Sequence, residues 1–106
     1  MNFHAHVYFE LDQLNSADRL RTRLIEEFGD RLRIYPLVPR KVGPHPLPMF
    51  EINFEGRLHA SLVARLEEWR GDHVVLIHED TGQDLQDHTA GATWLGEPLE
   101  LDLSRF

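Results

Sequence analysis

The sequence predicts an α+β domain whose elements follow the order β-α-β-β-α-β. Several segments alternate apolar and polar residues, as half-buried strands do, and two others carry apolar residues at helical spacing. The helical segments separate the strands in the order of a ferredoxin-like split βαβ sandwich, and a turn-rich C-terminal extension follows.

Length and composition narrow the class of protein further. The 106 residues are the length of one domain, so we expect a single domain over residues 1–106. Acidic residues outnumber basic ones by 18 to 11, and the net charge of -7 argues against a nucleic-acid partner. No segment approaches the roughly 20 apolar residues that span a bilayer, so we also expect no membrane partner. The chain has no cysteine, so a reducing cytoplasm is the expected compartment and any metal needs histidine, carboxylate or water ligands.

The first half of the chain contains a predicted strand, helix and second strand. Residues 3–10 alternate strictly and form the first strand. Residues 17–28 form a helix that Ser16 or Asn15 caps and that ends at Gly29. The apolar stripe of this helix consists of Leu20, Leu24, Ile25 and Phe28. Residues 31–37 alternate again, but Pro36 cannot donate to a ladder, so this strand should lie at an edge or end there.

The second half repeats the pattern. Residues 49–55 alternate as a strand, and residues 57–70 form an amphipathic helix. Residues 73–78 are almost continuously apolar, which is typical of a strand buried on both faces. In the extension, residues 92–95 and 99–103 are candidate short strands.

Right-handed crossovers would place the first and third strands in the middle of the sheet, with both helices on one face. The opposite face would then carry polar side chains: His4, His6, Tyr8, Glu51 and Asn53. We expect the C-terminal tail and a second copy of the chain to cover this face, and hence a homodimer.

The strongest chemical signal on that face is the pair His4 and His6, two of seven histidines. Residues i and i+2 of a strand point to the same side, roughly 6.6–6.8 Å apart along the chain. Two imidazoles in this relation can converge on one metal ion.

Other histidines could join the pair. His45 lies between Pro44 and Pro46 on a stiff loop, and His78 ends the last core strand. Two histidines with Glu51 would supply the ligand types of a facial triad.

Further residues could support such a site. His88 follows Asp84 and Asp87, either of which could orient its ring by accepting the second ring N–H. Tyr8 and the Arg40-Lys41 pair could contact a phenolate or a carboxylate. His59 and His73 are expected at the surface, outside the site. Imidazole ligands suit Zn, Fe, Ni or Cu, so the residues alone leave the metal open.

Several motifs together resemble the DOPA 4,5-dioxygenase family. The resemblance extends from Phe3 to about Gly96 and rests on five segments in order: FHAHVYF at residues 3–9, VGPHP at 42–46, HEDTG at 78–82, the segment from Asp84 to Thr89, and WLG at 94–96. Two positions differ from the family pattern: Glu79 stands where proline is expected, and Ala90-Gly91 stands where a further histidine is expected.

The resemblance implies a ferredoxin-like fold and extradiol ring cleavage of a catechol such as DOPA with O₂. It implies Fe(II) as the metal, with Zn or another divalent ion as the alternative. The implied ligand pool is His4, His6, His45 and His78, of which three would suffice, and the implied acid/base is His88. From the residues themselves, we add Glu51 as a possible further ligand and Tyr8 as a possible catalytic residue. The alternatives are a metal- or small-ligand-binding module of the same fold without oxygenase turnover, and a metal-free dimer that uses the sheet face for association.

Overall fold

A computed structural model describes all of residues 1–106, and one antiparallel sheet organises the chain. Its five strands have the order β2-β3-β1-β4-β5, so β1 and β3 lie inside the sheet as predicted. The strands are β1 (Asn2–Tyr8), β2 (Arg33–Ile34), β3 (Met49–Glu55), β4 (Val75–Glu79) and β5 (Ala92–Leu95). The α+β class is confirmed, and β5 extends the sheet beyond the four strands of the β-α-β-β-α-β core.

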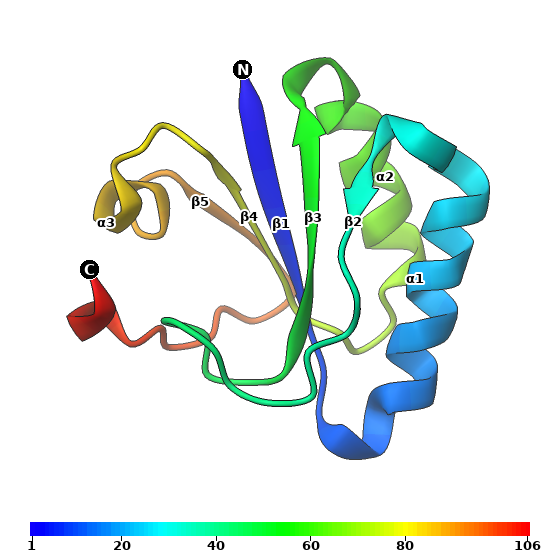
Figure 1. Cartoon of the computed structure of the whole chain (residues 1–106), viewed down its shortest axis with the longest axis horizontal. Helices are drawn as coiled ribbons and strands as arrows, with labels where there is room; N and C mark the ends of the chain where they lie inside the picture. The colour runs from blue at the N-terminus through cyan, green and yellow to red at the C-terminus, as the bar shows by residue number, and fades with distance from the viewer.

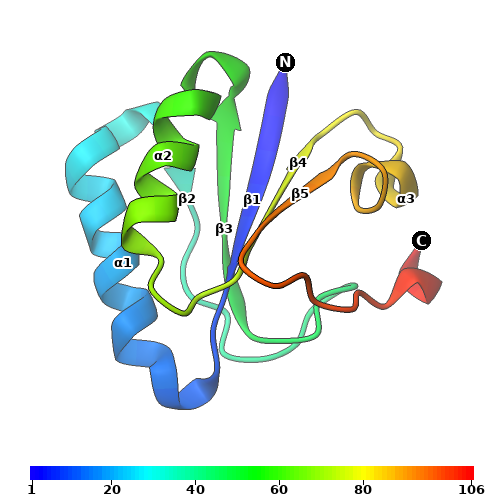
Figure 2. The ribbon, with the colours of Figure 1, turned by 180° about the vertical axis from the view of Figure 1, so that it is seen from behind.

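Two long helices, α1 (Leu14–Phe28) and α2 (His59–Trp69), cover one face of the sheet (Figures 1 and 2). The apolar sides of the strands meet them there, with Ala5, Ile52 and Ile77 almost fully buried. None of the helices is both long enough and apolar enough to cross a bilayer.

The opposite face carries the polar side chains, as the period-2 pattern of β1 and β3 predicted. Loop and tail segments lie on this side, together with the short helix α3 (Asp84–Asp87) (Figure 1). The tail is tied to the loop that precedes β3, because the Asp102 N–H donates to the Pro44 carbonyl at 2.9 Å. Leu99 and Leu101 of the tail pack against the buried cluster of Tyr8, Met49 and Leu76. The tail therefore covers part of this face, and the expected partner subunit stays a prediction.

The start of α1 differs from the prediction. A 3₁₀ turn, η1 (Leu11–Gln13), leads directly into the helix, and Glu10 and Gln13 form a capping box there. Ser16 is therefore inside the helix rather than at its N-cap. Its hydroxyl contacts His73 Nε2 at 2.8 Å.

The prediction that His73 lies on the surface is wrong. Its Nδ1–H donates to the Tyr8 carbonyl at 3.0 Å, so its Nε2 accepts from the Ser16 hydroxyl. His73 is 4% exposed and fastens α1 to the end of β1 and the entry to β4. His59 lies at the start of α2, with its ring 4.9 Å from that of Phe3.

Several predicted boundaries also move. β2 is only two residues long, because the 3₁₀ turn η2 (Gly29–Arg31) precedes it and Pro36 cannot donate after it. Pairing with β3 resumes at an isolated bridge between Val38 and Met49. The 3₁₀ turn η3 (Gly56–Leu58) delays the start of α2 to His59. The predicted strand at 99–103 is absent; the tail is irregular and ends in the 3₁₀ turn η4 (Leu103–Arg105).

Two adjacent residues of α1 test how the helix packs. Leu24 is fully buried, whereas Ile25, which the predicted stripe included, is 41% exposed. We expect Leu24→Ala to lower the free energy of unfolding by about 2–5 kcal/mol, because it leaves a cavity in the core. The matched Ile25→Ala variant should lose less than about 1 kcal/mol. Urea denaturation of both variants measures the difference, and equal losses would contradict this packing.

Candidate metal centre

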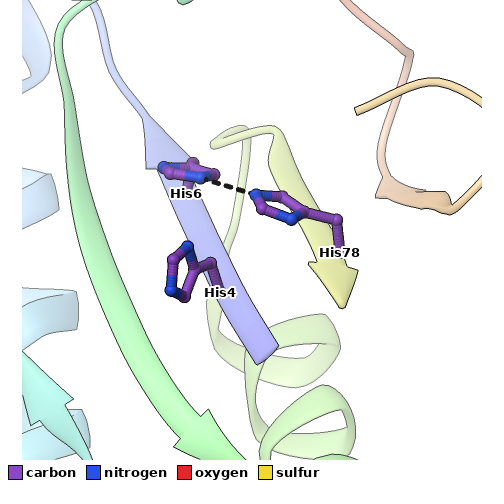
Figure 3. A group of neighbouring side chains, drawn as sticks. All are labelled: His4, His6 and His78. Atoms are coloured by element: carbon purple, nitrogen blue, oxygen red, sulfur yellow. Dashed lines mark hydrogen bonds between the residues drawn. The ribbon is translucent and has the colours of Figure 1, made fainter. Parts of the chain in front are cut away.

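The centre begins with two histidines of β1 and one of β4. His4 and His6 project from the same face of β1, and His78 projects beside them from the neighbouring strand (Figure 3). The strand register places His4 directly opposite His78. One ring nitrogen from each of the three lies within 4.8 Å of the others, a spacing at which they could hold a metal ion. The predicted strand pair therefore gains His78 as its neighbour.

A second group shares His6. Ring nitrogens of His6, His45 and His88 also lie within 4.8 Å of one another. His45 comes from the loop before β3, where its backbone N–H donates to the Val42 carbonyl at 3.1 Å. His88 follows α3, and its ring centroid is 4.1 Å from that of His78. We call the five residues His4, His6, His45, His78 and His88 the histidine cluster.

Backbone carbonyls fix the orientation of two cluster rings. His78 Nδ1 lies 3.0 Å from the Glu79 carbonyl, and His88 Nδ1 lies 2.7 Å from the Asp84 carbonyl. A carbonyl oxygen only accepts, so each Nδ1 carries the ring hydrogen. When these imidazoles are neutral, each Nε2 therefore keeps its lone pair, which is the state that a metal or a proton requires.

Of the two aspartates expected to orient His88, only Asp84 does so. Asp84 orients His88, but through its backbone carbonyl rather than its carboxylate. The Asp87 carboxylate instead accepts hydrogen bonds from the Thr81 N–H (2.9 Å) and hydroxyl (2.6 Å). Burial would raise the pKa of Asp87, but these two bonds outweigh it and hold the pKa below its usual range. Asp87 thus stabilises the turn between β4 and α3.

His6 lies in the middle of the cluster. Its Nε2 is 3.1 Å from His78 Nε2, while its Nδ1 is buried without a hydrogen-bond partner. The Glu51 carboxylate approaches this nitrogen to 3.7 Å, as the pairing of β1 with β3 predicted. That distance is too long for a hydrogen bond. Glu51 therefore lies next to the cluster, on the side of His6 away from His78.

Burial keeps the central histidines uncharged at neutral pH. It lowers the pKa of His6 well below its ordinary value, and the neighbouring imidazoles, His45 first, lower it further. Burial, with His88 and His78, lowers the pKa of His45 to about 4. Burial also lowers the pKa of His78, although the hydrogen bond to the Glu79 carbonyl opposes the shift. Neutral imidazole is the form that binds metal.

The nitrogens of His6 and His78 fit a metal ion. At metal–nitrogen bonds near 2.05 Å, two ligand nitrogens lie about 2.9 Å apart at a right angle and about 3.3 Å apart at the tetrahedral angle. The observed 3.1 Å falls within this interval. A metal on His6 Nε2 would also require the ring hydrogen on Nδ1. The Glu51 carboxylate, 3.7 Å away, would have to move closer to accept that hydrogen.

Tyr8 was expected to contact a ligand directly, but it is buried against His45. Its side chain is 1% exposed, and its hydroxyl lies 2.7 Å from His45 Nδ1. Burial raises the pKa of the phenol, which is therefore protonated at neutral pH. Tyr8 contacts the cluster through His45.

Two cavities border the cluster on the tail side. One, of about 630 Å³, lies between the loop and the tail and includes His45, Lys41 and Arg105 in its wall. The other, of about 250 Å³, includes His88, Trp94 and Leu99. Of the basic pair proposed from the sequence, Lys41 lines the larger cavity.

Three neighbours of the cluster were not singled out in the sequence. The Asp80 carboxylate lies 3.5 Å from His4 Nε2, and the Phe106 ring lies 4.8 Å from that of His88. Trp94 stacks on Tyr8 with a centroid distance of 6.1 Å. The sequence could have indicated Asp80, because it follows His78 by two residues and so points to the same side of the chain, next to β1. No local pattern indicates Phe106, because only the path of the tail brings it to His88.

Comparisons with known proteins agree with one another. The model of the Dopa 4,5-dioxygenase family matches residues 3–105. An uncharacterized 21.2 kDa protein of Botryotinia fuckeliana is 37% identical over 96% of this chain and 61% of its own length. A DOPA 4,5-dioxygenase of Amanita muscaria is 30% identical over 98% of this chain and 49% of its own length. The chain thus spans about half to three fifths of these relatives.

The fold has a counterpart among solved structures. A crystal structure of a protein from Nostoc punctiforme, provisionally assigned as a dioxygenase, superposes with a TM-score of 0.87 at 31% identity. The match covers 98% of this chain and 89% of the other. The family match over nearly every residue, together with this structural match, shows that the chain belongs to the Dopa 4,5-dioxygenase family.

Proposed function

We propose that this protein is an extradiol dioxygenase that cleaves a catechol, of which DOPA is one example, with O₂ at a histidine-bound Fe(II). The observation that carries the proposal is the histidine cluster, in which His6, His45 and His78 are buried and Nε2 of His6 lies 3.1 Å from Nε2 of His78. Family membership supports the reaction class.

His4, His6 and His78 are the residues that would hold the metal. They come from two hydrogen-bonded strands, so the sheet fixes their relative positions before any ion binds. When bound, Fe(II) supplies the open coordination positions and the redox chemistry that a reaction between a catechol and O₂ needs. Zn or another divalent ion would fit the same nitrogens without supplying that redox chemistry.

In this proposal, His88 accepts a proton from a substrate hydroxyl. The Asp84 carbonyl holds the ring hydrogen on Nδ1, so Nε2 is the basic atom. The ring of His88 stands over His78 and forms part of the wall of the smaller cavity. A catechol in that cavity would lie beside His88 and Trp94.

The larger cavity suits a substituent on the ring. Lys41 and Arg105 bring positive charge to its wall, and Glu100 and Asp102 bring negative charge. A catechol whose side chain carries both a carboxylate and an amine matches this mixture. This assignment supports an amino-acid-like substrate over unsubstituted catechol.

A second candidate function is metal or small-ligand binding without turnover. One observation favours it: Ala90-Gly91 stands where the family pattern has a further histidine. Oxygen consumption separates the two candidates.

Metal content tests the strand histidines. We expect His6→Ala to reduce bound Fe(II) after anaerobic reconstitution at least tenfold, because it removes the central ligand. His59→Ala is the matched control and should bind as the wild type does, since His59 lies at α2 against Phe3. Elemental analysis gives the stoichiometry. Full occupancy in His6→Ala would exclude this strand pair as the site.

Oxygen uptake tests the reaction. The Fe(II)-loaded wild type should consume O₂ with DOPA or catechol and form a product that absorbs visible light. His88→Gln should lower kcat about 10²–10⁴-fold with unchanged iron content, because it removes the base. Absence of uptake by the wild type across a panel of catechols would favour the binding-only function.

The metal-free protein should lose stability as the pH falls from 7 to 5. The folded pKa values of His6, His45 and His78 lie below 6.5, so below that pH the unfolded state binds more protons than the folded state. Between its folded pKa and 6.5, each such histidine contributes a slope of up to about 1.4 kcal/mol per pH unit, and this slope falls toward zero as the pH rises above 6.5.

Urea denaturation at several pH values measures this slope. His45→Gln, which cannot take up a proton, should flatten it between pH 6 and pH 5. An unfolding free energy that is constant from pH 7 to pH 5 would show that these histidines are not buried as neutral groups.

A further inference from the structure

We infer that Tyr8 is a positioning residue that fixes the ring hydrogen of His45 on Nε2, so that His45 acts as a neutral hydrogen-bond donor beside His88. The catalytic consequence rests on the proposed function, whereas the position of the hydrogen does not. His45 then has a different role from that of metal ligand, which the sequence suggested for it.

Tyr8 and His45 form a short, buried hydrogen bond. The phenol hydroxyl and His45 Nδ1 are 2.7 Å apart, and His45 Nδ1 is the one hydrogen-bond partner of that hydroxyl. Both side chains are buried, at 1% and 7% exposure. The bond is therefore shielded from competing water.

The direction of the bond follows from the hydrogens available. If Nδ1 carried the ring hydrogen, it would donate to the phenol oxygen, and the phenol O–H would be left buried without an acceptor. An unpaired buried donor costs about 1–3 kcal/mol. If Nδ1 is bare, the phenol donates to it and both groups are satisfied. With Nδ1 bare, the His45 ring carries its single hydrogen on Nε2.

This arrangement is the reverse of that of His78 and His88. Their Nδ1–H groups donate to the carbonyls of Glu79 and Asp84, so their Nε2 atoms are bare. A metal or a proton needs a bare nitrogen, and His45 offers none while Tyr8 donates to it. The cluster thus contains two kinds of histidine, and the partner of Nδ1 distinguishes them.

The two kinds meet at one point. Ring nitrogens of His45 and His88 lie within 4.8 Å of each other and of His6. An oxygen atom between them would receive a hydrogen bond from His45 Nε2–H, while His88 Nε2 could take a proton from a neighbouring hydroxyl. A neutral donor aimed at an oxygen that gains negative charge stabilises the transition state electrostatically.

Nuclear magnetic resonance of the metal-free protein tests the position of the hydrogen. Two-bond ¹H–¹⁵N correlations of ¹⁵N-histidine-labelled protein at pH 7.5 distinguish Nδ1–H from Nε2–H rings, with His45→Gln identifying the His45 signals. We expect Nε2–H for His45 and Nδ1–H for His78 and His88. His73, whose Nδ1–H donates to the Tyr8 carbonyl outside the cluster, is the internal reference for Nδ1–H.

The variant Tyr8→Phe removes the phenol and should move the His45 signals toward the Nδ1–H pattern. The matched control is Tyr35→Phe, which removes a hydroxyl bonded to Asn53 on β3 and should leave His45 unchanged. An Nδ1–H ring for His45 in the wild type, or His45 signals that do not respond to Tyr8→Phe, would overturn the inference. If Tyr8→Phe does not fold, the wild-type spectrum decides alone.

Kinetics test the catalytic consequence separately. In the Fe(II)-loaded protein with DOPA, Tyr8→Phe should lower kcat about 10–100-fold, with KM and iron content unchanged, because the donor loses its orientation. An unchanged kcat would limit Tyr8 to a structural role. If the wild type itself consumes no O₂, the proposed function fails, while the spectra still decide where the hydrogen of His45 lies.

Discussion

The burial of β1 on both faces is the constraint on which the rest of this structure depends. The strand lies between β3 and β4, and its alternating residues enter two different environments. Ala5 and Val7 complete the apolar core beneath the helices, while His6 and Tyr8 are equally buried on the other side. Polar side chains buried in this way cannot rely on water, so each needs a partner within the protein.

That requirement organises the histidine cluster. Several imidazoles within a few ångströms of one another cannot all be charged, and burial lowers the pKa values of the central ones. Each neutral ring has one donor and one acceptor, so the partner of one nitrogen determines the state of the other. The Asp84 carbonyl makes His88 basic at Nε2, and the Tyr8 hydroxyl makes His45 a donor there. Within the cluster, Nδ1 of His6 is buried without a partner, and the Glu51 carboxylate lies 3.7 Å from it.

Much of the fold, and one face of the candidate site, could be predicted from the local sequence. Strict alternation determined which side of β1 and β3 is apolar, because the side-chain period of a strand is two. It correctly put His4, His6 and Glu51 on one face. It could not reveal the burial of His73, which depends on contacts with segments distant in the chain. Nor does strand alternation indicate the capped 3₁₀ turn before α1, although its capping box joins Glu10 and Gln13 locally. Ile25 shows the same limit: its spacing fits the apolar stripe, but the width of the buried face depends on how α1 packs.

The sequence by itself determined the element order, the polar face of the sheet and the identity of the histidines. Only the tertiary structure brought His78, His45 and His88 to His6, because they arrive from a strand end, a proline-rich loop and a short helix separated along the chain. It also decided what each ring can do, since hydrogen-bond partners such as the Glu79 carbonyl and the Tyr8 hydroxyl are matters of distance. A residue type supplies the chemistry of an imidazole, but its neighbours in space determine which nitrogen is free.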